Sequence, residues 1–247
     1  LKESINQFDK DFSGKSISLD TSEFFYQDRK IGIGSSSAVS VALTKAFNQL
    51  FDLRLTPKAI INDAREIHSR AQDSSGSGFD IITSFVGTRT LSCRILDNGD
   101  YDYEKVELPE AIKIFAVIND EYVQTSEMID RYKTAKSKYR DYFSEHAPKM
   151  KLELELLYDS ILQKDNKSIF QYLGRYNDLL VDMDNLFNLG IFNNHHELAE
   201  LAKDKDIFYK PSGSGGGDIG LFISDDRKKL NSICENLELK GITFFEI

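Results

Sequence analysis

The feature that most constrains the fold is a glycine-rich segment near the carboxyl end, KPSGSGGGD at residues 210–218. It holds four glycines and two serines between two apolar segments. Ordering so many glycines costs backbone entropy, and an ordinary hairpin would not need them. A flexible linker is one interpretation. Because apolar segments adjoin both ends directly, the pattern favours a loop that approaches a ligand or another stretch of backbone closely.

A second loop of similar composition, GIGSSS at residues 32–37, lies between an extended segment and a predicted helix. Backbone N–H groups and the positive end of the helix dipole make such a position an anion site, and serine hydroxyls can reach a phosphate or a metal ion. The spacing is neither that of a Walker A loop nor that of the dinucleotide fingerprint. Glycine and serine before a helix are also typical of a plain turn and cap.

Periodicity predicts an α+β chain. In the first part, apolar residues at helical spacing predict a helix over about 37–52, and Thr56 before Pro57 predicts the start of another that runs to about residue 71. Residues 16–26 read as an irregular or bulged strand, 73–80 as a loop, and 81–95 as a helix turn or a strand. Asn98-Gly99 predicts a hairpin turn.

The second part begins with a buried-strand run over 112–118, so the domains are expected at 1–110 and 111–247. Helices are predicted over about 126–146, 150–163 and 167–188. Then follow a strand, the glycine-rich loop, a strand, a charged helix at 225–240 with a solvated face, and a last strand, which is an α+β ending.

Composition excludes several classes of function. The 31 Lys and Arg against 40 Asp and Glu give a net charge of −9, which disfavours binding to nucleic acid phosphates. No apolar run is long enough to span a membrane. Cys93 and Cys234 are expected to be core residues of a protein in the reducing cytoplasm. His68 is interpreted as a packing residue, and adjacent His195 and His196 do not suit a shared metal ion.

Three stretches carry a family resemblance: residues 20–43 with the GIGSSS loop, HSRAQDSSGSGFDIITSFVG at 68–87, and KPSGSGGGDIG at 210–220. Together, and in this order, they resemble the GHMP family of small-molecule kinases, and within it the phosphomevalonate kinases. The resemblance implies an amino-terminal domain like that of ribosomal protein S5, a ferredoxin-like carboxyl-terminal domain, and an active site in the cleft between them.

The sequence departs from the family pattern in small ways. Ile33 replaces a leucine, and Ser37 and Ser214 each replace an alanine. The family's opening strand with its lysine, and the segment that holds the adenine, are expected to precede Leu1.

The resemblance assigns roles to residues of the first part. Gly32, Gly34 and the serines Ser35, Ser36 and Ser37 are expected to bind the phosphates of ATP, with the Ser36 hydroxyl also a ligand of Mg²⁺. Asp80 is expected to act as a general base or to orient the acceptor. Taken by itself, Asp80 reads equally well as a helix N-cap.

In the second part, the resemblance implies that the glycine-rich loop lines the cleft and touches the substrate. The residues concerned are Lys210, Ser212, Gly213, Gly215, Gly216 and Gly217. Lys210 is alternatively a solvated strand end. Further candidates near the substrates are Arg29, Lys30, Arg70, Arg89, Gln124, Thr125 and Ser126, the last three also reading as a helix cap.

The resulting hypothesis is an ATP- and Mg²⁺-dependent kinase that converts 5-phosphomevalonate into 5-diphosphomevalonate. It expects a small phosphorylated substrate and neither nucleic acid nor membrane as partner. Two alternatives stay open: another GHMP kinase, such as a mevalonate or sugar kinase, and a non-catalytic binding or regulatory protein with the same fold.

Overall fold

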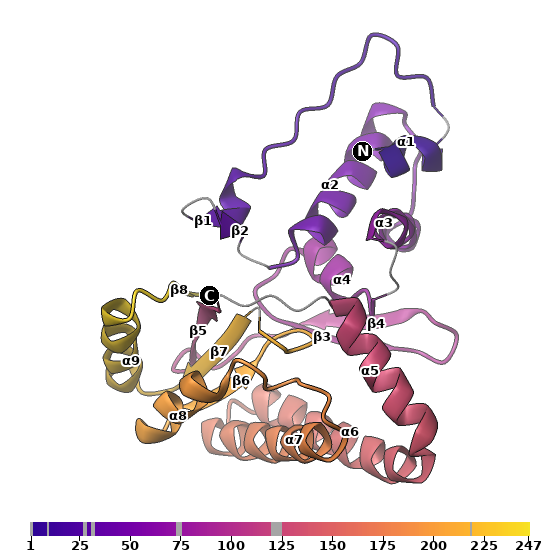
Figure 1. Cartoon of the computed structure of the whole chain (residues 1–247). Coiled ribbons are helices and arrows are strands. Elements are labelled where there is room, and N and C mark those ends of the chain that lie inside the picture. Colours follow the sequence, from indigo (N-terminus) through magenta and orange to yellow (C-terminus); the bar gives the residue numbers. More distant parts are fainter. Residues whose placement is uncertain are drawn as a thin grey trace. The chain divides into compact units, whose positions relative to one another are not determined.

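A computed structural model describes residues 2–8, 10–26, 29–30, 33–72, 76–119, 125–217 and 219–247 (Figure 1). The chain divides into two compact units, Leu1–Glu104 and Lys105–Ile247.

The first unit combines helices with two short two-stranded sheets, β1–β2 and β3–β4. Its elements are α1 (Lys2–Phe8), a 3₁₀ turn (Ser22–Phe24), β1 (Phe25–Tyr26), β2 (Arg29–Lys30), α2 (Ser35–Leu50), α3 (Pro57–Gln72), α4 (Phe79–Val86), β3 (Leu91–Ile95) and β4 (Tyr101–Lys105).

The helices of the first unit pack around one apolar core. Buried side chains from α2, α3 and α4 meet there, namely Val41, Ile61, Ala64, Ile81 and Ile82. The two helices predicted for 37–52 and 56–71 are confirmed as α2 and α3. Thr56 begins α3 as expected, since its hydroxyl accepts the N–H of Ala59 at 3.2 Å.

The strand predicted over 16–26 is wrong except at its end, because only Phe25–Tyr26 pairs with a neighbouring strand. Asp20 accepts the backbone N–H of Ser22 at 3.0 Å, and this local bond bends the chain into a turn. Leu19 and Phe25 are exposed, so no apolar layer covers this segment to hold it extended.

Residues 81–95, for which helix and strand were both open, contain both: α4 ends at Val86 and β3 follows. The predicted hairpin is confirmed, with β3 and β4 paired and Gly99 in the left-handed region at φ +80°.

The second unit is built on a four-stranded antiparallel sheet with the strand order β6-β7-β5-β8. Its strands are β5 (Lys113–Ile118), β6 (Phe208–Pro211), β7 (Ile219–Ser224) and β8 (Phe244–Glu246), and its helices are α5 (Thr125–Lys138), α6 (Arg140–Leu162), α7 (Asn166–Phe187), α8 (His196–Asp204) and α9 (Arg227–Leu239). The strand predicted over 112–118 is confirmed as β5.

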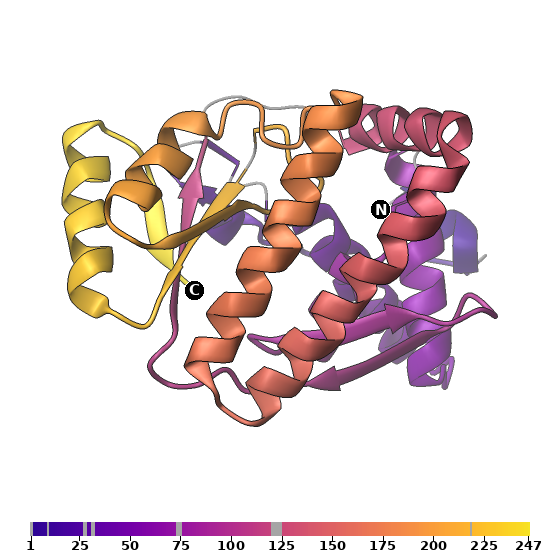
Figure 2. The same ribbon diagram turned by 90° about the horizontal axis from the view of Figure 1, so that it is seen from below.

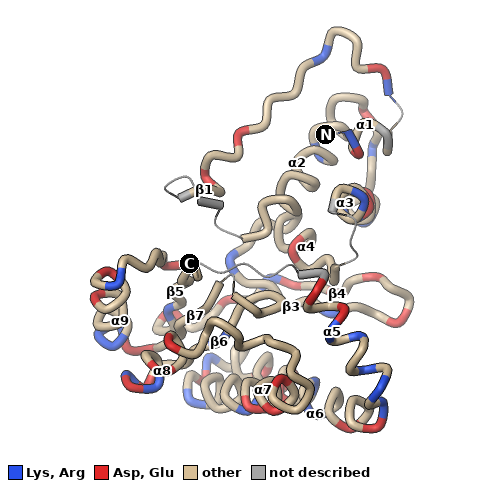
Figure 3. Tube along the Cα trace, viewed as in Figure 1, with Lys and Arg blue, Asp and Glu red and all other residues tan. Residues whose placement is uncertain are grey.

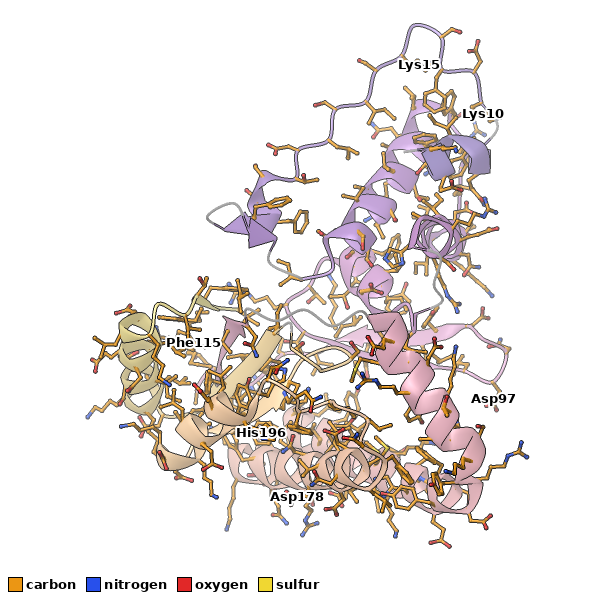
Figure 4. All side chains as sticks on the ribbon, viewed as in Figure 1. Lys10, Lys15, Asp97, Phe115, Asp178 and His196 are labelled. Atoms are coloured by element: carbon orange, nitrogen blue, oxygen red, sulfur yellow. The ribbon has the colours of Figure 1, made fainter. Side chains whose placement is uncertain are left out.

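Helices cover both faces of this sheet because successive strand residues point to opposite sides. Phe115 and Phe222 pack against residues of α8 and α9 on one face, and Figure 4 shows the Phe115 side chain on the side of α9. Ile114 and Leu221 pack against α6 and α7 on the other. Figure 2 shows α6 and α7 side by side.

The predicted helix boundaries in this unit are partly wrong. The break between the first two helices lies at Tyr139, and Pro148 is inside α6. Proline has no N–H group, so Pro148 leaves the carbonyl oxygen of Ser144 without its helical partner. Both residues are exposed, so water can replace the missing hydrogen bond. Helix α8 was not predicted. Among the helices of the described residues, none has both the length and the apolar character needed to cross a membrane.

Helix α9 has the solvated face expected for residues 225–240. Leu230, Ile233 and Leu237 are buried, whereas charges of both signs line the rest of the helix (Figure 3). Cys234 lies half-buried against the same core and Cys93 against the core of the first unit, and burial raises the pKa of each thiol.

Candidate functional site

The serine-rich loop leads directly into the amino-terminal end of α2. Gly34 is the N-cap, in the left-handed conformation at φ +77° that glycine adopts at little cost. Ser35, Ser36 and Ser37 form the first helical turn, whose backbone N–H groups lack intrahelical partners and lie at the positive end of the dipole. The start of α2 therefore offers the free N–H groups that the predicted anion site would need. Gly32 lies outside the described residues.

Two serine hydroxyls of this turn meet an imidazole and a carboxylate. Nε2 of His68, on α3, lies 3.0 Å from Oγ of Ser36 and 3.2 Å from Oγ of Ser37. The Ser37 hydroxyl also donates a hydrogen bond to the carboxylate of Asp80, on α4. Side chains from three helices thus form one polar cluster, which we call the serine cluster: Ser36, Ser37, His68 and Asp80.

His68 is the residue of this cluster that the sequence interpretation missed. Its half-buried imidazole is hydrogen-bonded, as expected of a satisfied packing histidine, but the partners are two of the predicted phosphate-binding serines. The signal was its place in the stretch 68–87, twelve residues before Asp80.

Asp80 is not the N-cap of its helix. That position belongs to Gly78, at φ +77°, and Asp80 lies in the first turn of α4. Its carboxylate is exposed and accepts the N–H of Ile81 at 3.0 Å through Oδ1. Oδ2 is the oxygen that accepts the Ser37 hydroxyl. A Cβ built on Gly34 would lie 3.7 Å from the Cβ of Asp80, so the serine-rich loop passes close to this carboxylate.

A pocket of about 330 Å³ adjoins the serine cluster within the first unit. Its polar lining includes Ser35, Ser36 and His68, and its apolar lining includes Phe24 and Leu43. A cavity with an apolar wall and a few convergent polar groups is typical of small-molecule sites.

In the second unit, the described residues of the glycine-rich loop, 212–217, follow β6 and precede β7. Ser212 donates its N–H to Ile219 O at 2.8 Å, which continues the pairing of the two strands. The backbone has positive φ at four glycines: Gly213, Gly215, Gly216 and Gly217. A linker between independent segments does not describe it, because it joins neighbouring strands of one sheet.

Lys210 and Ser212 lie at the end of β6 and the start of this loop, and both are half-buried. The Lys210 ammonium donates to Pro211 O at 2.6 Å, and burial lowers its pKa. Within the described part of the chain, no carboxylate forms an ion pair with it. The alternative prediction, that Lys210 is a solvated charge at the end of a strand, is therefore wrong.

The other candidates are not brought to either loop by a contact of the described residues. Arg70 pairs with Glu66 of its own helix, and Arg89 is exposed. The backbones of Arg29 and Lys30 form β2, and Thr125 and Ser126 begin α5, but their side chains, like the whole of Gln124, lie outside the described residues.

His195 is fully buried in the second unit, where its hydrogen-bond partner is Tyr209 and not His196. Its Nδ1 lies 2.7 Å from the hydroxyl of Tyr209, on β6. Burial, with smaller contributions from His196 and Lys210, lowers the pKa of His195 from 6.5 to about 4. Its imidazole is therefore neutral at pH 7, and the unfolded chain binds one proton more than the native chain between these two pH values.

This difference predicts a pH-dependent stability. The contribution of neutral His195 is complete above pH 6.5 and is lost as the pH falls toward 4. We expect the free energy of unfolding to fall by about 2 kcal/mol from this residue between pH 7 and pH 5. Urea unfolding at both pH values measures it, with His195→Gln as control. An equal pH dependence in both proteins would contradict the buried neutral histidine.

Comparison with known proteins gives a family match for the first unit and a fold for the whole chain. Residues 2–88 match the family described as GHMP kinases N terminal domain. No curated protein matches the sequence.

Several solved structures resemble this chain. A Lin0012 protein from Listeria innocua has a TM-score of 0.83 at 19% identity, over 98% of this chain and 76% of that one. Streptococcus pneumoniae phosphomevalonate kinase, solved with phosphomevalonate and AMPPNP, has a TM-score of 0.75 at 18% identity, over 100% and 80%. L. major mevalonate kinase in complex with R-mevalonate has a TM-score of 0.70 at 16% identity, over 89% and 67%.

The serine cluster thus lies within the matched stretch of residues 2–88, and the similarity in fold extends over both units. Residues 2–88 match the GHMP kinase N-terminal domain, and the chain has the GHMP kinase fold.

Proposed function

We propose that this protein transfers the γ-phosphoryl group of ATP to the phosphate of 5-phosphomevalonate and so forms 5-diphosphomevalonate in the mevalonate route to isoprenoids. The serine cluster is the observation that carries the proposal. Phosphoryl transfer depends on positioning and charge neutralisation more than on covalent chemistry, and these are what a helix start with oriented hydroxyls supplies. The fold shared with a kinase solved with phosphomevalonate and AMPPNP supports this acceptor.

In this proposal the nucleotide phosphates bind at the start of α2. The backbone of Gly34 and the three serines offers N–H donors, and the side chains of Ser36 and Ser37 are oriented by His68. Gly32 remains a predicted member of the same loop.

The Ser36 hydroxyl is the proposed protein ligand of a magnesium ion that arrives with the nucleotide. Mg²⁺ prefers oxygen ligands and in such sites is held by one or two protein oxygens together with phosphates. The residues that the structure describes contain no cluster of three His, Cys, Asp or Glu side chains able to hold a metal by themselves. When bound, the ion neutralises charge on the transferring phosphates.

The acceptor phosphate is proposed to bind at the glycine-rich loop of the second unit. Lys210 supports this, since its half-buried ammonium has a lowered pKa and a phosphate dianion would supply the missing counter-charge. The Ser212 hydroxyl and the backbone of Gly213 and Gly217 lie in the same loop, where glycine lets a ligand approach closely. The N–H groups of Gly215 and Gly216 bond Ser212 O and Ile191 O and so hold the shape of the loop. Together these residues make up the proposed acceptor site.

A phosphate acceptor changes what is required of Asp80. The second ionisation of a phosphate group has a pKa of about 6, so the oxygens of a phosphate acceptor are already largely deprotonated at pH 7 and no base is needed to activate them. A hydroxyl acceptor would need one. Because Asp80 accepts the Ser37 hydroxyl, we assign it the positioning of the serine-rich loop.

The acceptor is tested by measuring ADP release with ATP, Mg²⁺ and either 5-phosphomevalonate or mevalonate. We expect turnover with the phosphorylated compound only. Turnover with mevalonate alone would replace the proposal by a mevalonate kinase. Saturable ATP binding without turnover on any acceptor would indicate a binding protein of the same fold.

His68→Ala is expected to weaken ATP binding, because the hydroxyls of Ser36 and Ser37 both lose their imidazole partner. Losing such a hydrogen bond at a partly buried site costs about 1.4 kcal/mol, which raises the KM for ATP about tenfold. Steady-state kinetics at fixed acceptor measures the change. His68→Gln, which can still bond a serine, should recover most of it. Equal KM values for wild type and His68→Ala would contradict a role for His68 at the nucleotide.

A further inference from the structure

The glycine-rich loop rests on another segment of the second unit, the turn of residues 188–195 that follows α7. Gly216 donates its backbone N–H to the carbonyl oxygen of Ile191 at 2.9 Å. A Cβ built on Gly215 would lie 2.5 Å from that same oxygen. Asn194 donates from its side chain to Gly216 O at 3.4 Å. The position of the Ile191 carbonyl therefore sets where the glycine backbone lies.

The turn is in its place because one buried carboxylate holds three consecutive N–H groups. Asp184, which is 8% exposed, accepts from Gly190 at 2.6 Å and from Ile191 at 3.0 Å through Oδ1, and from Phe192 at 2.9 Å through Oδ2. Burying a carboxylate is costly unless its oxygens are satisfied. Across the described residues no Lys or Arg forms an ion pair with Asp184, so the three N–H groups of the turn satisfy its carboxylate oxygens.

Ending the helix does not by itself require this side chain. Helix α7 ends at Phe187 and is followed by Asn188 in the left-handed conformation. The N–H of Leu189 already bonds the backbone carbonyl of Asp184 at 3.3 Å. The carboxylate serves the residues beyond the helix, and through Ile191 it reaches the glycine-rich loop.

We propose that Asp184 is a positioning residue for the acceptor site: it fixes the turn of residues 188–195, and the turn fixes the glycine-rich loop. The assignment rests on the proposed function in so far as the loop binds the acceptor. The Asp184 carboxylate is buried, and both of its oxygens are bonded to the turn. It acts through hydrogen bonds from its carboxylate to the turn and from the loop to Ile191.

The variant Asp184→Asn tests the proposal, because one carboxylate oxygen becomes an NH₂ group that cannot accept from the turn. We expect hydrogen exchange at the amides of Gly215 and Gly216, followed by NMR, to become at least tenfold faster. The KM for 5-phosphomevalonate should rise about tenfold, and the KM for ATP should change less than twofold. Asp182→Asn, an exposed position on the same helix, is the matched control and should leave all three unchanged.

Unchanged exchange at Gly216 in a folded Asp184→Asn protein would overturn the positioning role, and so would equal increases in both KM values. If Asp184→Asn does not fold, Asp184→Glu gives the same readouts, because it keeps the charge but moves the carboxylate by one methylene. The exchange measurement needs no turnover. A wild-type protein that phosphorylates no acceptor would therefore refute the proposed function, while the exchange result would still decide the role of Asp184.

Discussion

Replacing Asp80 with asparagine is expected to lower the turnover number by about a hundredfold. The Asp80 carboxylate accepts the Ser37 hydroxyl and the N–H of Ile81, so the amide must lose one of these contacts or turn its NH₂ group toward a donor. The serine-rich loop then shifts relative to the nucleotide phosphates. Small misplacements of reacting groups are enough to cost a factor of this size.

Steady-state kinetics with 5-phosphomevalonate measures this effect, and the pH profile separates two roles for Asp80. If it positions the loop, wild type and variant should both follow the ionisation of the acceptor phosphate near pH 6. If it acts as a base, the variant should lose a pH-dependent limb that the wild type has. Asp97→Asn is the control, because Figure 4 shows Asp97 at the hairpin between β3 and β4. A turnover near that of wild type for Asp80→Asn would remove Asp80 from the mechanism.

Gly215→Ala is expected to destabilise the second unit and to abolish acceptor binding. Gly215 has φ +78°, and its Cβ would lie 2.5 Å from Ile191 O and 2.7 Å from Ile191 Cγ2. The left-handed conformation costs a non-glycine residue about 1–2 kcal/mol, and overlap with a backbone atom adds about 1–3 kcal/mol. We expect the free energy of unfolding to fall by at least about 2 kcal/mol, and turnover at ordinary acceptor concentrations to fall more than tenfold.

The matched control is Gly241→Ala, in the same unit but outside the glycine-rich loop. Gly241 has φ +68° but no atom within 4 Å of its Cβ position, so only the conformational cost applies. Urea unfolding and acceptor kinetics of the two variants measure the difference. If the two alanine variants had equal effects, the close approach between the glycine-rich loop and Ile191 would contribute neither to stability nor to acceptor binding.

Local sequence signals predicted much of the fold. Thr56-Pro57 predicted where α3 starts, Asn98-Gly99 predicted the hairpin, and the run at 112–118 predicted the central strand β5, because in each case the determining interactions lie within a few residues. The strand over 16–26 failed since a strand needs a partner and an apolar layer, which local alternation does not provide. The helix break predicted between residues 146 and 150 is absent because α6 continues through Pro148, and the cost of proline in a helix depends on whether water can reach the freed carbonyl.

The candidate site could be predicted only where its residues carry their own signature. Gly34 and Gly215 need positive φ, which is a local property of glycine, and both loops were found in the sequence. His68 and Asp184 carry no such signature. His68 reaches Ser36 because α3 packs on α2, and Asp184 reaches the loop through a turn that bends back after α7. Contacts of this kind depend on tertiary packing, which residue spacing alone does not encode.

The most direct test of the account is a crystal structure of this protein with a nonhydrolysable ATP analogue, Mg²⁺ and 5-phosphomevalonate. We predict that the β and γ phosphates lie against the first turn of α2 at Ser35–Ser37. The phosphate of the acceptor should lie within hydrogen-bonding distance of Lys210 or the loop of residues 212–217. A nucleotide bound away from α2, or an acceptor bound without contact to the glycine-rich loop, would contradict the proposed kinase site.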